Sequence, residues 1–260
     1  MLLVVDVGNT HTTFGLFDRD RLSAERRILT NRDRTVDETA VSILGLLSLD
    51  RLSPKDVEGV ALASVVPSVT AALREAATQL FGRPPIVVSS EMNLGIKLAV
   101  DRPSQVGADR IVNAIAAFKR HGAPAIAVDL GTATTFDCVS QDGRFLGGAI
   151  TPGIGTLAAA LPASTAILPK AELSAPDSAM GKNTLTAIQS GVFLGYVELV
   201  EGLVRRLRSE MDGQPIVVAT GGFAEIVAPH CRSIDRCDRH LTLYGLLDFF
   251  ERNRNETPRR

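Results

Sequence analysis

Two segments of the chain carry an aspartate at the end of an apolar run, a glycine two residues later and a threonine-rich turn. The first is VVDVGNTHTTFG, with Asp6 and Gly8, and the second is AVDLGTATTFD, with Asp129 and Gly131. Glycine lets the backbone approach an anion closely, while turn N–H groups and threonine hydroxyls donate hydrogen bonds to phosphoryl oxygens. An aspartate beside them can hold a hydrated cation. The two segments therefore indicate polyphosphate binding.

The recurrence of this pattern separates two interpretations. Two ordinary β-hairpins could carry threonines because threonine favours strands. However, the aspartate and the glycine recur at the same spacing, and each segment continues into Thr-Phe and a second apolar run. This self-similarity favours phosphate binding and indicates that each half of the chain follows one plan.

A third acidic residue lies in the segment SQVGADRIVNA. Helical spacing places Gln105, Asp109 and Asn113 on one stripe, and the apolar residues among them turn toward a core. The stripe is either a solvated helix face or one wall of a site, and the pattern alone does not separate the two. Asp109 is thus a candidate to position a nucleophile.

The elements that must hold these residues alternate along the chain. A capping box from Thr35 to Glu38 predicts an amphipathic helix, and the strand-like VEGVALASVVPS is followed by the helical VTAALREAATQLFG. Strands that alternate with helices predict an α/β fold with mixed sheets covered by helices. The clearest break, HGAPA at Gly122, predicts a boundary between one domain over 1–121 and another over 122–260.

The composition excludes several classes of protein. With 28 basic and 29 acidic residues, the chain has no net field that would draw it to nucleic acid or to an anionic membrane. The opening MLLVV runs straight into Asp6, so we expect a strand rather than a secretory signal, and we expect no membrane-spanning helix. Three sparse cysteines indicate reduced thiols, and we expect a cytoplasmic location.

Six motifs spread over the chain resemble those of one family. DVGNTHTTFG, GADRIVNA, VDLGTATTFD, GGAITPGIG, GKNT and ATGGFA occur in the order of type III pantothenate kinase, in the superfamily of sugar and acetate kinases, actin and heat-shock ATPases. The resemblance implies two similar ribonuclease H-like domains of the actin-like ATPase type. It also implies ATP-dependent phosphorylation of pantothenate to 4'-phosphopantothenate, the first step of coenzyme A biosynthesis, by a homodimer whose active site lies near the subunit interface.

The resemblance implies a role for each acidic residue. Asp109 corresponds to the general base that takes the proton from the pantothenate hydroxyl, Asp6 would hold Mg²⁺, and Asp129 would help to bind a monovalent cation, K⁺ or NH₄⁺. Arg110 would pair with the substrate carboxylate, because guanidinium and carboxylate groups can bind bidentately. The nucleotide phosphates would contact Asp6, Val7, Gly8, Asn9, Thr10, His11, Thr12, Thr13 and Thr132. The pantothenate contacts would be Gly107, Ala108, Asp109, Arg110 and Thr184.

At two positions the sequence leaves the contacts with substrate or nucleotide undecided. Val100 stands where the family commonly carries a tyrosine, and the loss of that phenol removes one polar substrate contact worth about 1 kcal/mol. Gly221 and Gly222 in ATGGFA could let adenine or ribose lie against the backbone, or could form an ordinary turn after a strand.

Three other signals carry less weight. His230, Cys231, Cys237 and His240 are four potential zinc ligands, but their spacing matches no standard zinc finger. The segment GIGTLA at Gly153 has the form of a dinucleotide fingerprint, although the family motif GGAITPGIG explains it as the start of a helix. No GxxxxGK[ST] segment occurs, which excludes a P-loop kinase.

Two further functions stay open beside pantothenate phosphorylation. A non-catalytic regulator of the same fold would bind nucleotide without transferring phosphate, although the retention of Asp6, Asp109 and Asp129 argues against it. A kinase for another small hydroxylated acid is kept open by Val100.

Overall fold

The chain forms two compact units. The computed structural model describes residues 1–164, 169 and 172–255. Unit 1 comprises Met1–Ala116 together with Leu241–Arg260, and unit 2 comprises Ala117–His240. The chain therefore passes from unit 1 to unit 2 after Ala116 and returns to unit 1 at Leu241.

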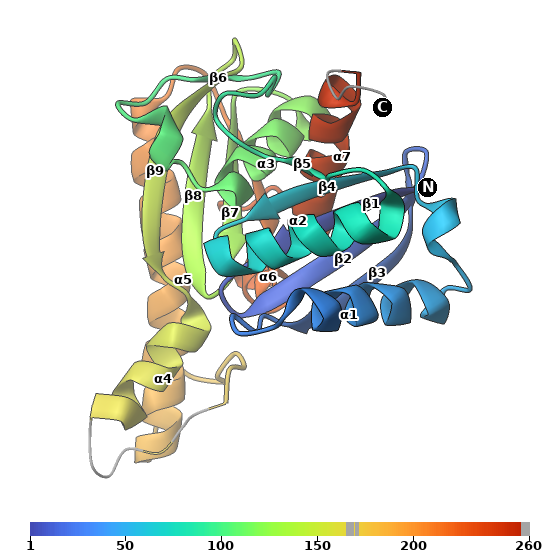
Figure 1. Ribbon diagram of the computed structural model, residues 1–260. Helices are drawn as coiled ribbons and strands as arrows, with labels where there is room; N and C mark the ends of the chain where they lie inside the picture. Colours follow the sequence, from blue (N-terminus) through green and yellow to red (C-terminus); the bar gives the residue numbers. More distant parts are fainter. Residues whose placement is uncertain (165–168, 170–171, 256–260) are drawn as a thin grey trace. The chain divides into compact units, whose positions relative to one another are not determined.

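Unit 1 is built on a mixed sheet (Figure 1). Its strands are β1 (Leu2–Val7), β2 (His11–Asp18), β3 (Arg21–Leu29), β4 (Gly59–Ser64) and β5 (Ile86–Val87). They lie in the order β3-β2-β1-β4-β5, with β1, β2 and β3 antiparallel and with β4 and β5 added in parallel. The turn between β1 and β2 therefore lies at the same end of the sheet as the carboxyl end of β4.

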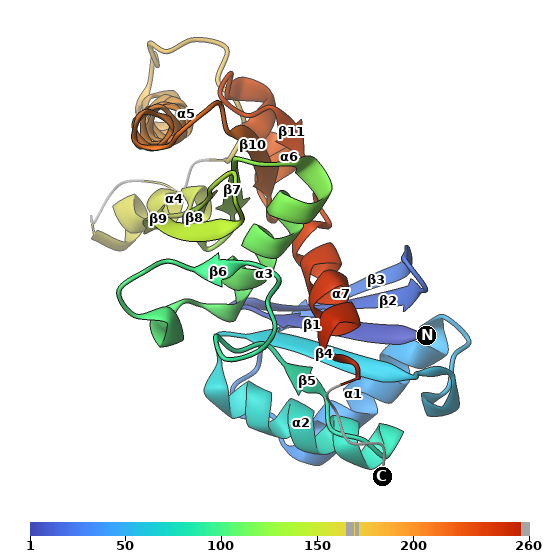
Figure 2. The same cartoon turned by 90° about the horizontal axis from the view of Figure 1, so that it is seen from above.

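Helices cover both faces of this sheet, as Figure 2 shows. α1 (Val36–Leu49) and α2 (Pro67–Phe81) pack on one face, and α3 (Ala108–Ala116) and α7 (Leu241–Asn253) pack on the other. The predicted capping box of α1 is confirmed, because the side chains of Thr35 and Glu38 accept hydrogen bonds from each other's backbone N–H groups.

Strand alternation decides which helices each side chain of β1 meets. Leu3, Val5 and Val7 join the core under α1 and α2, while Leu2 and Val4 join the core under α3 and α7. Successive side chains of a strand point to opposite faces, so Asp6 belongs to the second set. The carboxylate therefore lies on the α3 side of the sheet, at the carboxyl end of β1.

Unit 2 repeats the same plan. Its strands are β7 (Ala125–Leu130), β8 (Ala133–Val139), β9 (Arg144–Pro152), β10 (Ile216–Thr220) and β11 (Arg236–Cys237). β7, β8 and β9 form an antiparallel meander, and β10 and β11 follow in parallel, so the order β9-β8-β7-β10-β11 matches that of unit 1. The expectation of two similar α/β halves with mixed sheets is confirmed.

Unit 2 also contains two longer helices. α4 (Ile154–Ser164) follows β9 directly, and α5 (Thr184–Glu210) buries Phe193, Val200 and Val204 against the sheet. By length and composition alone, α5 is long and apolar enough to cross a membrane, which the sequence analysis did not anticipate. A core helix of a soluble protein passes the same test, and α5 contributes to the unit 2 core.

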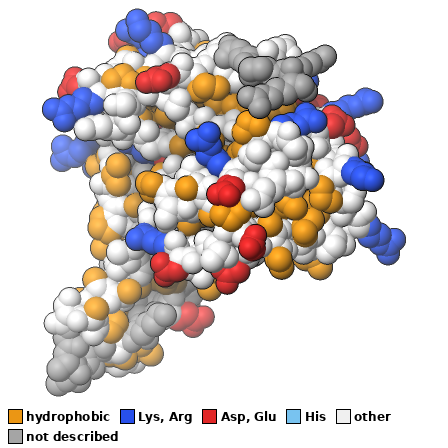
Figure 3. Space-filling model, in the orientation of Figure 1, with side chains coloured by type: hydrophobic (Ala, Val, Ile, Leu, Met, Phe, Trp, Pro, Cys, Tyr) orange, Lys and Arg blue, Asp and Glu red, His pale blue; other side chains and the backbone are white. Residues whose placement is uncertain are grey.

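The remaining elements are short. They are η1 (Pro54–Asp56), β6 (Lys97–Leu98), η2 (Pro103–Gln105), the π-helical η3 (Ala117–His121), α6 (Ala224–Val227) and η4 (Ala228–His230). On the face drawn in Figure 3, basic and acidic side chains are interspersed, as the near-zero net charge predicts.

Candidate active site

The turn after β1 opens toward solvent and is held by its own backbone. Gly8 N–H donates to the carbonyl oxygen of His11 at 3.0 Å, and the backbone N–H of Thr30 donates to the carbonyl oxygen of Thr10 at 2.9 Å. The side chains of Asn9, Thr10 and His11 are exposed. The turn that was predicted to receive phosphates therefore leaves polar side chains accessible while its shape is fixed.

Hydroxyl groups support this turn from the side of α1 and α2. Thr30 Oγ1 donates to the carbonyl oxygen of Gly8 at 2.8 Å, and it also pairs with Thr12 Oγ1 at 3.0 Å. A hydroxyl has one proton to donate, so Thr12 must be the donor in the second bond. The proton of Thr12 is thus committed to Thr30, and Thr12 is only 3% exposed. Its side chain supports the turn from within the protein.

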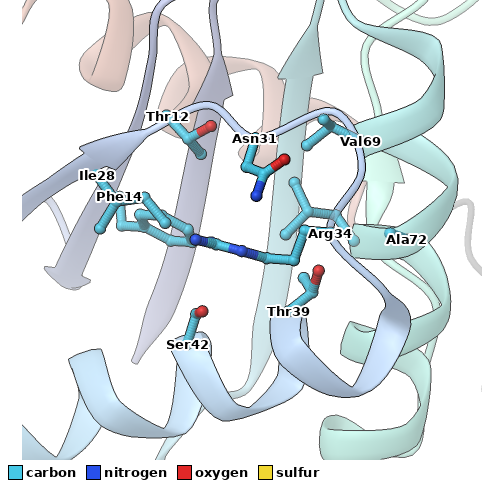
Figure 4. Close-up of a pocket in the computed structure, with 10 residues that line it drawn as sticks. Thr12, Phe14, Ile28, Asn31, Arg34, Thr39, Ser42, Val69 and Ala72 are labelled. Carbon is cyan, nitrogen blue, oxygen red and sulfur yellow. The ribbon is translucent and has the colours of Figure 1, made fainter.

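A small pocket lies beneath Thr12, between the sheet and the two helices (Figure 4). The Arg34 side chain crosses it toward Phe14, and Asn31, Thr39 and other residues complete its walls. Its volume is 20 Å³, which is room for about one water molecule. A nucleotide or an acid substrate does not fit there.

Asp109 lies in the first turn of α3 with its carboxylate folded back over the helix start. Its Oδ1 accepts a hydrogen bond from the backbone N–H of Arg110 at 2.8 Å. A β-carbon at position 107 would collide with this same oxygen, so a side chain there would displace the Asp109 carboxylate. Burial raises the pKa of Asp109 above the usual value of an aspartate, and the hydrogen bond and charge of Arg110 oppose that shift. The result is a partly desolvated carboxylate with increased proton affinity.

Asp6 and the start of α3, which carries Asp109, lie at the same end of the unit 1 sheet, where β1 and β4 end. Val65 N–H, just beyond β4, donates to the carbonyl oxygen of Val7 at 3.1 Å. A β-carbon at Gly107 would lie 3.6 Å from Val65 Cγ1, so the start of α3 packs on this edge. Because Asp6 faces the α3 side of the sheet, two of the three predicted acidic residues belong to one region of unit 1.

The second hairpin is tied to the start of α4. The carbonyl oxygen of Thr132 accepts hydrogen bonds from Gly153 N–H at 3.0 Å and from Thr156 Oγ1 at 2.7 Å. A β-carbon at Gly153 would collide with the carbonyl oxygens of Gly131 and Thr132. The interpretation of GIGTLA as a helix start is confirmed, and it brings the positive end of the α4 dipole to the exposed Thr132.

Asp129 lies near the carboxyl end of β7, and the backbone of a glycine packs against its carboxylate. Gly221 has a φ of +93°, and a β-carbon at that position would collide with Asp129 Oδ1 and the backbone of Leu130. Any other residue would be strained by the left-handed conformation and displaced by this contact. The glycine after β10 therefore lets the chain turn directly beside the acidic residue.

Thr184 belongs to unit 2, where it stands at the amino end of α5. It is the first residue of α5, after the N-cap Asn183, whose Oδ1 accepts a hydrogen bond from Thr186 N–H at 2.9 Å. Thr184 is exposed and lines an open groove of about 880 Å³ between α4 and α5. This groove, which Leu157, Ile188 and Tyr196 also line, is large enough for a ligand or a protein segment.

The candidate zinc ligands do not assemble into a metal site. Among the described residues, no group of three or more histidine, cysteine or acidic side chains could hold a metal ion. The His230 ring packs edge-on against Phe193, with ring centroids 5.1 Å apart. Burial raises the pKa of the Cys231 thiol to about 12, which disfavours the thiolate that zinc requires. Phe193 and Cys231 instead belong to the unit 2 core.

Sequence reasoning missed Thr30, Thr220 and Asp137 around the two hairpins. Thr30 follows β3, and only the register of the antiparallel sheet brings it to Gly8. Thr220 on β10 is the register partner of Asp129 on β7, and Asp137 lies on β8 two residues after Thr135, the other register partner of Asp129. The segments ATGG and TTFD contain Thr220 and Asp137, so both residues stand within recognised motifs. Their partners could not be predicted, because they depend on strand pairing between residues far apart in the chain.

A sequence model of the family "Type III pantothenate kinase" matches residues 2–206. A protein of that name from Moorella thermoacetica is 45% identical over 253 residues, which cover 97% of this chain and 100% of the relative. Another of that name, from Roseiflexus sp., is 44% identical over 98% of this chain and 100% of the relative.

Solved structures show the same fold at low sequence identity. A Campylobacter jejuni protein assigned to the Baf family of transcriptional activators has a TM-score of 0.61 and 18% identity, over 97% of this chain and 99% of that chain. Component A of (R)-2-hydroxyglutaryl-CoA dehydratase from Acidaminococcus fermentans has a TM-score of 0.57 and 14% identity, over 95% and 94% of the two chains. Together with sugar kinase structures, these neighbours confirm the actin-like ATPase and sugar-kinase fold.

Proposed function

The chain belongs to the type III pantothenate kinase family, and on this premise we propose how its residues divide the work of the reaction. The enzyme transfers the γ-phosphoryl group of ATP to pantothenate, in the first step of coenzyme A biosynthesis. The observation that carries this function is the family match over nearly the whole chain, with 45% identity to the Moorella thermoacetica relative.

We propose Asp109 as the general base. The hydroxyl oxygen of pantothenate forms a bond to the γ-phosphorus, the bond from that phosphorus to the bridging oxygen of ADP breaks, and the hydroxyl proton passes to a carboxylate oxygen of Asp109. The raised pKa of Asp109 supports this role, because proton affinity increases as the carboxylate is desolvated. Its fixed place at the start of α3 supports a second role in orienting the alcohol.

The divalent metal that ATP-dependent kinases use is proposed to bind at Asp6. A half-buried carboxylate at the carboxyl end of β1 offers the oxygen ligand that Mg²⁺ prefers. When bound, the metal neutralises charge on the phosphates during transfer. The chain's own part is to hold the carboxylate and the turn from Gly8 to Thr10 in place, through the hydrogen bonds of Thr30.

The two hairpins are proposed to bind the nucleotide phosphates. In the first, backbone N–H groups and exposed side chains between Val7 and Thr13 are the expected donors. Thr12 is proposed to act there through its backbone and through its support of Thr30, since its hydroxyl proton is already used. In the second, Thr132 and the amino end of α4 offer donors and a favourable dipole.

Pantothenate is proposed to meet Gly107, Ala108 and Arg110 around the general base. The Arg110 guanidinium is suited to the substrate carboxylate, and its helix position keeps it next to Asp109. Val100 is half-buried and supplies no hydrogen bond from its side chain, so substrate affinity has to come from the remaining contacts. Gly221 and Gly222 are kept as proposed neighbours of the adenosine.

The enzyme is proposed to work as a cytoplasmic homodimer with K⁺ or NH₄⁺ at Asp129. The groove between α4 and α5 supports the dimer, because Gly191 and Gly195 lie along it and a β-carbon at either meets nothing within 4 Å. Small residues let a second helix approach closely. Thr184, at the amino end of the same groove, would then lie near the subunit contact, in agreement with its proposed place in the pantothenate site.

An assay of phosphoryl transfer tests the function directly. Purified enzyme with MgATP, KCl and pantothenate should form ADP and 4'-phosphopantothenate in equal amounts, measured by mass spectrometry. Transfer to another hydroxylated acid but not to pantothenate would support the second kinase hypothesis, which Val100 motivates. ATP binding without transfer to any hydroxylated acid would support a regulator.

A further inference from the structure

A row of oxygen-bearing side chains crosses the sheet of unit 2 at Asp129. Thr220 on β10 is the register partner of Asp129 on β7, and Asp129 is the register partner of Thr135 on β8. Register partners present their side chains on the same face of a sheet. The neighbouring residues Val128, Leu130, Phe136 and Ala219 pack in the core on the opposite face. The side chains of Thr220 and Thr135 therefore lie on either side of the Asp129 side chain.

The Thr220 hydroxyl lacks a partner in the described part of the chain. Thr220 is 1% exposed, and its Oγ1 is buried without a hydrogen bond. A buried polar atom left without a partner costs free energy, so such atoms are rare in native proteins. Binding a cation or another ligand would give this buried hydroxyl oxygen the partner that it lacks in the described structure.

The Thr135 hydroxyl is oriented by a buried carboxylate. Its Oγ1 donates to Asp137 Oδ2 at 3.0 Å, and Asp137 is 0% exposed. Because the proton of Thr135 is used in this bond, the lone pairs of its oxygen are left to accept or coordinate. The corresponding position in the first hairpin, two residues after Thr13, is Gly15. The buried carboxylate therefore distinguishes the second hairpin from the first.

We propose that Thr220 and Thr135 are additional oxygen ligands of the monovalent cation at Asp129, and that Asp137 is a positioning residue that orients Thr135 for this task. This inference rests on the proposed assignment of the cation to Asp129. One carboxylate and two hydroxyl oxygens form an oxygen-only donor set, which suits a hard cation. The first hairpin holds its proposed cation with Asp6 and has no counterpart of Asp137.

The test compares Thr220→Val with Thr134→Val in the full-length enzyme. Valine has the shape of threonine without the hydroxyl. Thr134 is a matched control on β8, because it is also fully buried, but its hydroxyl bonds Tyr196 on the opposite side of the strand. The first readout is the rise in melting temperature on adding KCl without substrates, compared with tetramethylammonium chloride at the same ionic strength. The second is the KCl concentration that gives half-maximal kinase activity.

Thr220→Val should raise the half-saturating KCl concentration about tenfold and reduce the KCl-specific thermal shift, as loss of an ion contact does. Thr134→Val should lower the melting temperature but keep the wild-type KCl dependence. Asp137→Asn should raise the half-saturating KCl concentration while the KM for pantothenate stays unchanged, since Asp137 is proposed to act on the cation by orienting Thr135.

Wild-type KCl dependence in folded Thr220→Val and Asp137→Asn would overturn the proposal and leave the kinase function intact. A wild-type enzyme that phosphorylates pantothenate equally well without any monovalent cation, and shows no KCl-specific thermal shift, would overturn it as well. Failure of the kinase function is a separate result, because it appears as the absence of 4'-phosphopantothenate at every KCl concentration. The thermal shift reports on the cation even in that case.

Discussion

The carboxylate of Asp109 occupies the space beside Gly107 where any other residue would place its β-carbon. Asp109 Oδ1 is held there by the backbone N–H of Arg110 at 2.8 Å. The absence of a side chain at position 107 thus decides where the proposed general base stands.

Gly107→Ala should lower kcat by about tenfold to a hundredfold, because an added methyl group displaces Asp109 and small misplacements of a catalytic group are costly. Steady-state kinetics together with circular dichroism measure the effect on a folded enzyme. Gly45→Ala is the matched control, since a β-carbon there meets nothing within 4 Å and the position is inside α1. Equal kcat values for the Gly107 variant and wild type would contradict this role of the glycine.

Asp109→Asn should fold and bind ATP, yet lose turnover by a factor of about 10² to 10⁴, because the amide keeps the shape but does not accept the proton. Single-turnover kinetics and calorimetric titration with ATP separate the two properties. Asp142→Asn, at an exposed hairpin position, should leave both unchanged. Turnover at the wild-type rate would remove Asp109 from the mechanism.

The same substitution should raise the free energy of unfolding at neutral pH. Burial raises the pKa of Asp109 in the folded protein above its value in the unfolded chain, so the folded state binds this proton more tightly than the unfolded state does. The contribution of Asp109 to the free energy of unfolding is therefore complete at pH values below its pKa in the unfolded state. It is lost as the pH rises through its pKa in the folded state. Asparagine has no charge to bury. In urea unfolding from about pH 4 to pH 8, the free energy of unfolding of the variant should increase relative to that of wild type as the pH rises. If the two free energies follow parallel curves against pH, burial of this charge costs nothing.

Thr30→Val should raise the KM for ATP and lower the free energy of unfolding by about 1 to 2 kcal/mol. The substitution removes the donor to the Gly8 carbonyl oxygen and the acceptor for Thr12, so the first turn loses its side-chain support. Kinetics at varied ATP and chemical unfolding provide the two measurements. Thr78→Val on α2 is a control, because its hydroxyl donates to the carbonyl oxygen of Arg74 in its own helix. If both variants show the same KM, the Thr30 bonds do not shape the nucleotide site.

Gly195→Leu should convert the proposed homodimer into a monomer without unfolding it. Position 195 lines the groove of α4 and α5, and a β-carbon there meets nothing within 4 Å. A leucine side chain would therefore project into the space that the second copy is proposed to occupy. Light scattering after size exclusion measures the mass, and Gly202→Leu, on α5 but outside the groove, is the control. A variant that stays dimeric would place the contact elsewhere.

Local patterns were sufficient for the elements and for the repeat. The capping box at Thr35, the apolar periodicity of α5 and the Asp-Gly spacing at both hairpins depend on residues close in the chain, and the predicted helix, long helix and paired hairpins are present. Such signals survive in a single sequence because capping, helical periodicity and strand alternation are short-range properties. The same short-range reasoning assigned all threonines of the first turn to phosphate, although alternation turns Thr12 inward and Thr13 to the other face.

The sequence by itself therefore determined the family, the α/β class and the acidic residues around which the chemistry is proposed. The tertiary structure alone decided which residues support them: Thr30 at Gly8, Thr220 and Thr135 beside Asp129, and α7 returning to pack on α3 in unit 1. These relationships join residues far apart in the chain. They depend on strand order and register, which are selected by the packing of whole elements and leave no local pattern at either residue.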